Sequence, residues 1–300
     1  MNITNHLNPQ VQQRIRTTGV PLVRVEKVVR DALSEDLADG VDVTSVATIS
    51  DRHHSRMTLV ARHSGVVCGL SFAEAVFAIV DSDVHVEYAA ADGDRVDPGA
   101  TLMTIDGVTR SLLAAERTAL NLLGRLSGIA TLTAHWVDAI AGTKATIRDT
   151  RKTTPGLRAL EKYAVRCGGG ANHRMSLTDA ALIKDNHVAA AGSVGAAIDA
   201  VKQRYPQLPR EVEVDTLEQL REACEHTDGL ILLDNFTVEQ VREAVALVGG
   251  RNQLEVSGGL SLDTVRAYAE TGVDFLAVGA LTHSAPVMDI AAELSPQEAH

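Results

Sequence analysis

The sequence predicts an α/β protein, an incomplete TIM-like α/β barrel that follows a smaller N-terminal α+β domain. Hydrophobic residues make up 45% of the 300 residues, which is enough for a large core. In the second half of the chain, β-prone runs begin at positions 211, 230, 253 and 274, about 20 residues apart. Helical patterns lie between these runs, and connections of this kind predict βα repeats and a parallel sheet.

Two earlier β-prone runs, at residues 145–148 and 181–183, precede these four. Six strands are fewer than a regular barrel requires, so we expect an incomplete or irregular barrel, with a doubly wound sheet as the alternative. Capping residues mark three helix starts within the repeat. They are Thr216 with Gln219, Thr237 with Gln240, and Ser261.

The first part of the chain has a different pattern. Apolar residues at helical spacing predict a helix over residues 25–33. Short β-prone runs and turns alternate over residues 57–107, interrupted by a helical pattern at 71–80. A long apolar helical pattern covers residues 111–141, and Gly128 predicts a break within it.

Charge and cysteine content exclude several classes of protein. The net charge of −11 disfavours a nucleic-acid partner. Cys68, Cys167 and Cys224 are too few and too widely spaced in the sequence for a disulfide framework or a zinc site. Free thiols fit a reducing compartment, and we expect no signal peptide and no membrane span, so the sequence predicts a cytoplasmic protein.

Charged or glycine-rich residues follow every predicted strand of the repeat. In chain order they are Asp149, Arg151 and Lys152; Lys184, Asp185, Asn186 and His187; Glu213 and Asp215; Asp234 and Asn235; Ser257, Gly258 and Gly259; and Gly279. Because the carboxyl ends of parallel strands meet on one face, this pattern predicts a functional site there.

Positive charge is concentrated between residues 144 and 184, where nine Lys or Arg stand against three acidic residues. This pattern suits carboxylate and phosphate ligands, although a solvated basic face would give the same count. The glycine-containing segments 257–259 and 279–284, after the last two strands, predict phosphate binding. Glu213 and Asp234 end neighbouring strands, where they can bind Mg²⁺ or pair with the lysines.

Long segments around these residues resemble the quinolinate phosphoribosyltransferases, also called carboxylating nicotinate-nucleotide pyrophosphorylases. The matching segments are residues 115–121, 149–158, 162–170, 172–174, 182–187, 213, 233–235, 257–259 and 281–284. The resemblance covers nearly the whole chain. One departure lies at residues 40–44, where the family more often has Gly-Asp-x-Thr.

The resemblance implies the transfer of phosphoribosyl from phosphoribosyl pyrophosphate to quinolinate, which yields nicotinate mononucleotide, pyrophosphate and CO₂ with the help of Mg²⁺. It also implies an N-terminal α/β sandwich domain over residues 1–118, on which residues 286–300 would pack, and a barrel over 119–285. Members are homodimers, or hexamers built of dimers, with an active site shared between subunits.

The resemblance further implies roles for single residues. Lys152, Lys184, Glu213 and Asp234 would be catalytic. The quinolinate carboxylates would be held by Arg117 of the partner subunit together with Arg151, His173, Arg174 and Lys184. Lys152 would contact the pyrophosphate, and Glu213 and Asp234 would bind the ribose and the metal. Phosphate would be cradled by Ser257, Gly258, Gly259, Gly279, Ala280 and His283.

Three other activities fit parts of the pattern. A phosphoribosyltransferase for a related pyridine carboxylate such as nicotinate needs fewer arginines than this chain provides. Lys184 at a strand end could form a Schiff base, as in an aldolase, if its pKa were lowered. A regulator that only binds anions would explain the basic cluster but not Glu213 and Asp234 beside it.

Overall fold

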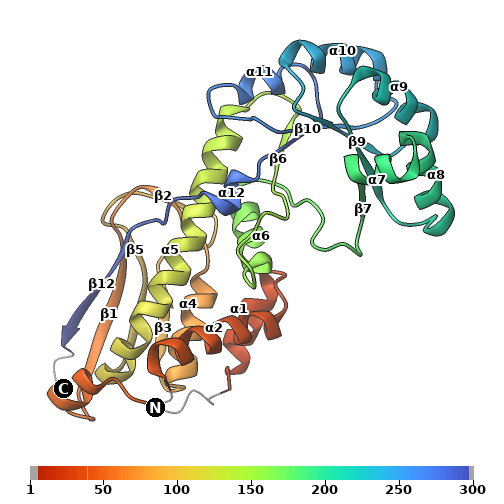
Figure 1. Ribbon diagram of the computed structural model, residues 1–300. Helices are drawn as coiled ribbons and strands as arrows, with labels where there is room; N and C mark the ends of the chain where they lie inside the picture. The colour runs from red at the N-terminus through yellow and green to blue at the C-terminus, as the bar shows by residue number, and fades with distance from the viewer. Residues whose placement is uncertain (1–5, 39, 297–300) are drawn as a thin grey trace. The chain divides into compact units, whose positions relative to one another are not determined.

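The computed structural model describes residues 6–38 and 40–296, and the chain divides into two compact units (Figure 1). Unit 1 comprises Met1–Ala134, Thr153–Gly169 and Ser284–His300, and unit 2 comprises His135–Lys152 and Gly170–His283. The chain passes from one unit to the other within the helix α5 (Thr109–Ala139) and again at three later points. The domain boundary expected after residue 118 stays a prediction.

Unit 1 is built on an antiparallel sheet with the strand order β12-β1-β5-β3. Its strands are β1 (His54–Ala61), β3 (His85–Tyr88), β5 (Thr101–Val108) and β12 (Ile290–Pro296). β12 pairs with one edge of β1 while β5 pairs with the other, so residues near the end of the chain complete the sheet. Two short strands, β2 (Gly65–Val66) and β4 (Arg95–Val96), form a separate ladder.

Helices complete unit 1. They are α1 (Pro9–Thr17), α2 (Leu22–Leu37), α3 (Val43–Thr48), α4 (Leu70–Val80) and α6 (Arg158–Cys167), together with most of α5. The helices predicted at 25–33 and 71–80 are confirmed as α2 and α4. Every residue of α4 is buried, which explains why its sequence is apolar on all sides.

The break predicted at Gly128 is wrong, because α5 runs without interruption from Thr109 to Ala139. The glycine has a packing role instead. A Cβ atom at this position would lie 1.9 Å from the carbonyl oxygen of Pro286, so only glycine lets that segment approach the helix. The same argument applies to Gly124, where a Cβ atom would lie 2.8 Å from the carbonyl oxygen of Met288.

Unit 2 contains a parallel sheet with the strand order β6-β11-β10-β9-β8-β7. Its strands are β6 (Thr146–Arg148), β7 (Ala181–Ile183), β8 (Arg210–Val214), β9 (Leu230–Asp234), β10 (Leu254–Ser257) and β11 (Phe275–Ala277). All six predicted strands are therefore confirmed. Each observed strand end coincides with the predicted end or differs from it by one residue.

The strand order distinguishes a barrel from a doubly wound sheet. From β7 to β11 each strand pairs with the next in the chain, without the reversal that defines a doubly wound sheet. β6, the first strand, pairs with the last, as in a closed ring. Among the described residues no ladder joins β6 to β7, so the barrel stays open at that point. The predicted incomplete TIM-like barrel is confirmed.

The connecting helices of unit 2 are α7 (Asp185–Ala191), α8 (Val194–Arg204), α9 (Leu217–His226), α10 (Val238–Val248), α11 (Val265–Ala269) and α12 (Ala280–His283). In Figure 1, α8 to α11 lie along one side of the strands. Thr216 and Thr237 cap α9 and α10 as predicted. Ser261 instead begins a turn, and α11 starts only at Val265. No described helix is both long and apolar enough to cross a membrane.

Candidate active site

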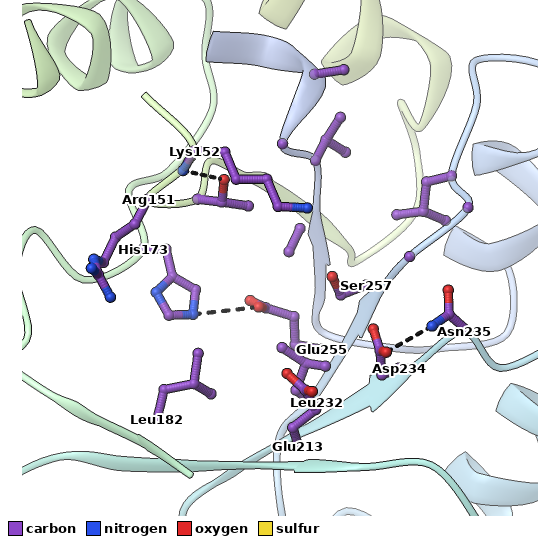
Figure 2. A pocket seen from close by; sticks show the side chains of 18 of the residues that line it. Arg151, Lys152, His173, Leu182, Glu213, Leu232, Asp234, Asn235, Glu255 and Ser257 are labelled. Atoms are coloured by element: carbon purple, nitrogen blue, oxygen red, sulfur yellow. Dashed lines mark hydrogen bonds and ion pairs between the residues drawn. The ribbon is translucent and has the colours of Figure 1, made fainter. Parts of the chain in front are cut away.

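A pocket of about 670 Å³ lies at the carboxyl ends of the strands of unit 2 (Figure 2). Its walls come from all six strands or the loops directly after them. The lining residues are Thr150, Arg151, Lys152, His173, Arg174, Leu182, Lys184, Glu213, Leu232, Asp234, Asn235, Glu255, Ser257, Gly258, Gly259, Leu260, Ala277, Val278, Gly279, Ala280 and His283.

Four cationic side chains line this pocket. Arg151 and Lys152 follow β6, Arg174 lies between β6 and β7, and Lys184 follows β7. The Oγ1 atom of Thr282 donates a 2.8 Å hydrogen bond to the carbonyl of Lys152, which fixes the loop that carries this lysine. Figure 2 shows the Lys152 side chain reaching across the pocket.

The guanidinium of Arg174 is only partly hydrogen-bonded by the described residues. Its Nη1 donates to the carbonyl of Ala180 at 2.9 Å, but its buried Nε has no hydrogen-bond partner among the described residues. Burial, and then the charge of Arg151, lower the pKa of Arg174. A half-buried guanidinium that feels the charge of a second guanidinium and is incompletely bonded is suited to an anionic ligand.

Two carboxylates lie at the same strand ends. Glu213 Oε2 accepts from the Nζ of Lys184 at 2.5 Å, and Asp234 Oδ2 accepts from the Nδ2 of Asn235 at 2.7 Å. Burial raises the pKa of Asp234, and the charges of Glu213 and Asp215 raise it further. A cation at this site would stabilise the ionised form of both carboxylates.

In both glycine-containing loops, the backbone of a glycine lies close to a neighbouring side chain. Gly258 has φ +87°, and a Cβ atom there would lie 2.2 Å from the Oδ1 of Asn235. Asn235 is also tied to the next strand, since its N–H donates to the carbonyl of Ser257 at 2.9 Å. At Gly279 a Cβ atom would lie 3.0 Å from the Cδ of Lys152. Glycine therefore keeps the pocket open at both loops.

His173 is held by a buried polar network. Asp149, which is fully buried, accepts from the backbone N–H of His173 at 2.8 Å. The N–H of Arg174 donates to His173 Nδ1 at 2.7 Å, so the ring proton is on Nε2, which lies 2.8 Å from the Oε2 of Glu211. The orientation of this imidazole is therefore set by the protein.

A buried acid pair lies beneath His173. Glu255 Oε1 is 3.5 Å from His173 Nε2, and Glu255 Oε2 accepts from Arg148 Nη1 at 2.7 Å (Figure 2). Burial raises the pKa of Glu211 to about 7, and burial and the charge of Glu211 raise that of Glu255 to about 7. The pair therefore binds protons at a higher pH than isolated glutamates do.

Five residues of the predicted strand-end pattern do not line the pocket: Asp149, Asp185, Asn186, His187 and Asp215. Every residue to which the resemblance gives a role lines it, except Arg117. That residue lies on the part of α5 that belongs to unit 1, with its side chain 66% exposed. Sequence reasoning missed Arg148, Glu211 and Glu255. Arg148 and Glu211 gave a weak signal, because β6 and β8 contain other polar residues. A clearer signal was available for Glu255, the one charged residue of a strand that is otherwise mostly apolar. Such a residue needs a buried partner.

The fold and the pocket define a class of protein, the incomplete α/β barrels with an anion-binding site at the strand ends. The sequence matches the family descriptions "Quinolinate phosphoribosyl transferase, N-terminal domain" over residues 42–127 and "Quinolinate phosphoribosyl transferase, C-terminal domain" over residues 129–293. The chain belongs to this family.

Known relatives agree. A nicotinate-nucleotide pyrophosphorylase [carboxylating] of Mycobacterium leprae is 52% identical, with 89% of this chain and 95% of the relative aligned. The crystal structure of NadC from Streptococcus pyogenes matches with a TM-score of 0.89 and 38% identity, over 93% of this chain and 99% of that one. Human nicotinic acid phosphoribosyltransferase shares the fold alone, at 12% identity and a TM-score of 0.58 over 89% of this chain and 75% of that one.

Proposed function

We propose that this protein transfers phosphoribosyl from phosphoribosyl pyrophosphate to quinolinate and releases CO₂, which yields nicotinate mononucleotide and pyrophosphate for NAD biosynthesis. The observation that carries the proposal is the pocket itself, in which four cations line the same cavity as three carboxylates inside a protein of net charge −11. Both substrates are polyanions, and bringing them together requires concentrated positive charge. Membership in the family supports the same reaction.

Quinolinate is placed by the arginines. Arg151 and Arg174 lie beside each other at one wall, and each can offer a planar pair of donors to a carboxylate. Lys184 supplies a point charge, and His173 borders the same wall with its ring fixed by Glu211. Leu182 and Leu232 give the pocket an apolar surface on which the pyridine ring can rest (Figure 2).

The phosphoribosyl donor occupies the remaining wall. Its phosphate oxygens accept hydrogen bonds from the backbone N–H groups of Ser257, Gly258, Gly259, Gly279 and Ala280 and from the side chain of His283. Lys152 reaches across the cavity, where it neutralises charge that develops on the departing pyrophosphate. Glu213 and Asp234 stabilise the positive charge that builds on the ribose as the bond to pyrophosphate breaks.

The same two acids suit Mg²⁺. Oxygen ligands are the ones this ion prefers, and burial, together with the charges of Glu213 and Asp215, raises the pKa of Asp234 although Lys184 and Lys152 act in the opposite direction. When bound, Mg²⁺ would add positive charge next to the phosphate oxygens of the donor. Glu213 and Asp234 would hold the ion, and Lys184, whose Nζ lies 2.5 Å from the Oε2 of Glu213, can also contact a substrate carboxylate.

Loss of CO₂ follows from the first step. Once the ring nitrogen carries the ribose it is positive, and this charge stabilises the electron pair left on the adjacent carbon when the carboxylate departs. The residues of this chain contribute by fixing the ring so that this carboxylate is the one beside the new bond. No nucleophilic serine or cysteine is required.

Arg117 extends the proposal to a dimer. Arg117 belongs to unit 1, whereas all the residues that line the pocket belong to unit 2. The side chain of Arg117 is 66% exposed. We propose that Arg117 completes the quinolinate site of a partner subunit in a homodimer, either alone or within a hexamer of dimers. The cytoplasmic location expected from the sequence belongs to the same proposal.

The test is a stoichiometry measurement. Purified full-length protein is mixed with quinolinate, phosphoribosyl pyrophosphate and Mg²⁺, and the loss of quinolinate is followed by absorbance while CO₂ and pyrophosphate are quantified. We expect one CO₂ and one pyrophosphate for each quinolinate consumed, and no turnover after chelation of the metal. Turnover of nicotinate without CO₂ would favour the related phosphoribosyltransferase, and binding without turnover would favour an anion-binding regulator.

A further inference from the structure

Two of the three cysteines of the chain, Cys68 and Cys167, lie together inside unit 1. Their sulfur atoms and a carboxylate oxygen of Asp92 all lie within 4.8 Å of one another. Cys68 comes just before α4, and Cys167 is the last residue of α6. Although they are far apart in the sequence, the two thiols are neighbours in space.

The two thiols differ in access and in acidity. Cys68 is fully buried, whereas Cys167 is partly exposed. A hydrogen bond with Cys68 lowers the pKa of Cys167, while burial and that same bond raise the pKa of Cys68. The positive charge of Arg166 favours the thiolate of both. Oxidants react with thiolates that they can reach, so Cys167 is the reactive member of the pair.

A metal ion is a poorer occupant of this cluster. Asp92 Oδ1 already accepts from the N–H groups of Gly69 and Leu70, at 2.9 and 3.0 Å, and so caps α4. Asp92 Oδ2 accepts from the hydroxyl of Tyr163 at 2.8 Å. Burial raises the pKa of Asp92, which also works against a free carboxylate ligand. Two sulfur atoms alone do not make a structural metal site.

We propose that Cys68 and Cys167 form an oxidisable dithiol that reacts with hydroperoxides and closes to a disulfide. In the first step the Cys167 thiolate attacks one peroxide oxygen, the O–O bond breaks, and the departing oxygen takes up a proton and leaves as water when the oxidant is hydrogen peroxide. In the second step Cys68 loses its proton, its sulfur attacks the sulfenic acid of Cys167, and the hydroxyl group leaves with that proton as water. The two thiols lose two electrons and the peroxide gains two.

Cys167 ends α6, and the start of this helix contacts the residues that directly follow the pocket residue Lys152. The first turn of α6 is bonded to the residues after Lys152, since Arg158 Nε donates to Thr153 Oγ1 at 2.9 Å and the N–H of Thr154 donates to Glu161 Oε2 at 3.0 Å. A disulfide at the other end of α6 would join this helix covalently to Cys68, two residues before the start of α4.

The experiment uses folded full-length protein that has been reduced and freed of reductant. Hydrogen peroxide is added, remaining thiols are alkylated at intervals, and peptides are identified by mass spectrometry without reduction. We expect the loss of two thiols per chain, a Cys68–Cys167 cross-linked peptide within one chain, and recovery of both thiols with dithiothreitol. Cys224 is the internal reference, because it is also partly exposed but burial raises its pKa, so it reacts more slowly.

Three variants sharpen the test. Cys224→Ser should leave the cross-link unchanged. Cys68→Ala should stop the reaction at a sulfenic acid on Cys167 that dimedone traps, and Cys167→Ala should leave Cys68 unreacted. If a variant does not fold, the wild-type time course still decides, since sulfenic acid on Cys167 must precede the cross-link.

Four results would overturn the proposal, whatever the catalytic activity of the protein proves to be. They are preferential oxidation of Cys224, oxidation of Cys167 to higher acids in the wild type without a cross-link, a disulfide that joins two chains, and zinc that binds tightly and protects both thiols from peroxide.

Discussion

Lys184 and Glu213 form an ion pair across two adjacent parallel strands, with Nζ 2.5 Å from Oε2. Lys184 lies just beyond the end of β7, and Glu213 lies within β8. The glutamate side chain is only 9% exposed while the lysine is 46% exposed, so one partner is anchored and the other can move. Each group thus has a partner before any substrate is bound.

This pairing predicts that the two residues act as a unit. Lys184→Ala and Glu213→Ala should each lower kcat/KM, and the double variant should lose less than the two single losses combined. Coupling of about 0.5–3 kcal/mol in transition-state free energy is typical of residues in contact. The matched control is an exposed ion pair on α10, in which Arg242 Nη1 lies 3.7 Å from Glu239 Oε1. Substitutions at these two residues should have nearly additive effects.

Arg174 should affect quinolinate more than the phosphoribosyl donor. Removing a charge-assisted bond to a carboxylate costs about 1.5–3 kcal/mol, so Arg174→Ala should raise the KM for quinolinate about 10- to 150-fold. Arg174→Lys should recover only part of the loss, because lysine lacks the planar pair of donors. Steady-state kinetics with each substrate varied separately measure this. Equal losses for both substrates would contradict the assignment, and exposed Arg242→Ala serves as the control.

How much of this site the sequence predicts depends on where each residue lies. Arg151, Lys184 and Asp234 follow strands directly, and the geometry of parallel strands brings such positions together whatever the details of packing. Glu255 could not be placed in this way. It lies inside β10, and its contact with His173 depends on which face of the strand points into the barrel and on a loop more than 80 residues earlier in the chain.

The fold shows the same division. The six strands of unit 2 were predictable, because each is a short β-prone run and helical patterns lie between most of them. Gly128 was misread because glycine has two roles in a helix, to interrupt it or to admit a close neighbour. Only the position of the Pro286 carbonyl, which is remote in sequence, decides between them. Long-range contacts of this kind also bring Cys68 to Cys167.

The buried acid pair predicts a pH dependence of stability. The pKa of Glu255 is raised from its ordinary value of 4.5 to about 7, so between these values the folded protein holds a proton that the unfolded chain has released. The free energy of unfolding should therefore fall as pH rises through this window, by up to about 1.4 kcal/mol per pH unit for one proton.

Glu255→Gln removes the ionisable group while keeping an oxygen that can accept from Arg148. Its urea-unfolding free energy should depend less steeply on pH between about 4.5 and 7 than that of the wild type. Exposed Glu239→Gln on α10 is the control and should leave the slope unchanged. A Glu255→Gln slope equal to the wild-type slope would show that Glu255 does not hold the proton.

Mixed dimers test whether Arg117 serves the site of another subunit. Arg117→Ala and Lys184→Ala proteins should each be nearly inactive by themselves, because each homodimer lacks one group at every site. If equal amounts exchange subunits at random, half of the dimers are mixed, and one of the two sites in each mixed dimer has both residues intact. A quarter of all sites in the mixture are then intact, so activity should recover to about a quarter of that of an equal amount of wild-type protein. The fraction of mixed dimers is measured by native mass spectrometry with one subunit isotopically labelled. Mixed dimers present in that proportion but still inactive would place Arg117 in its own subunit's chemistry, or outside the site altogether.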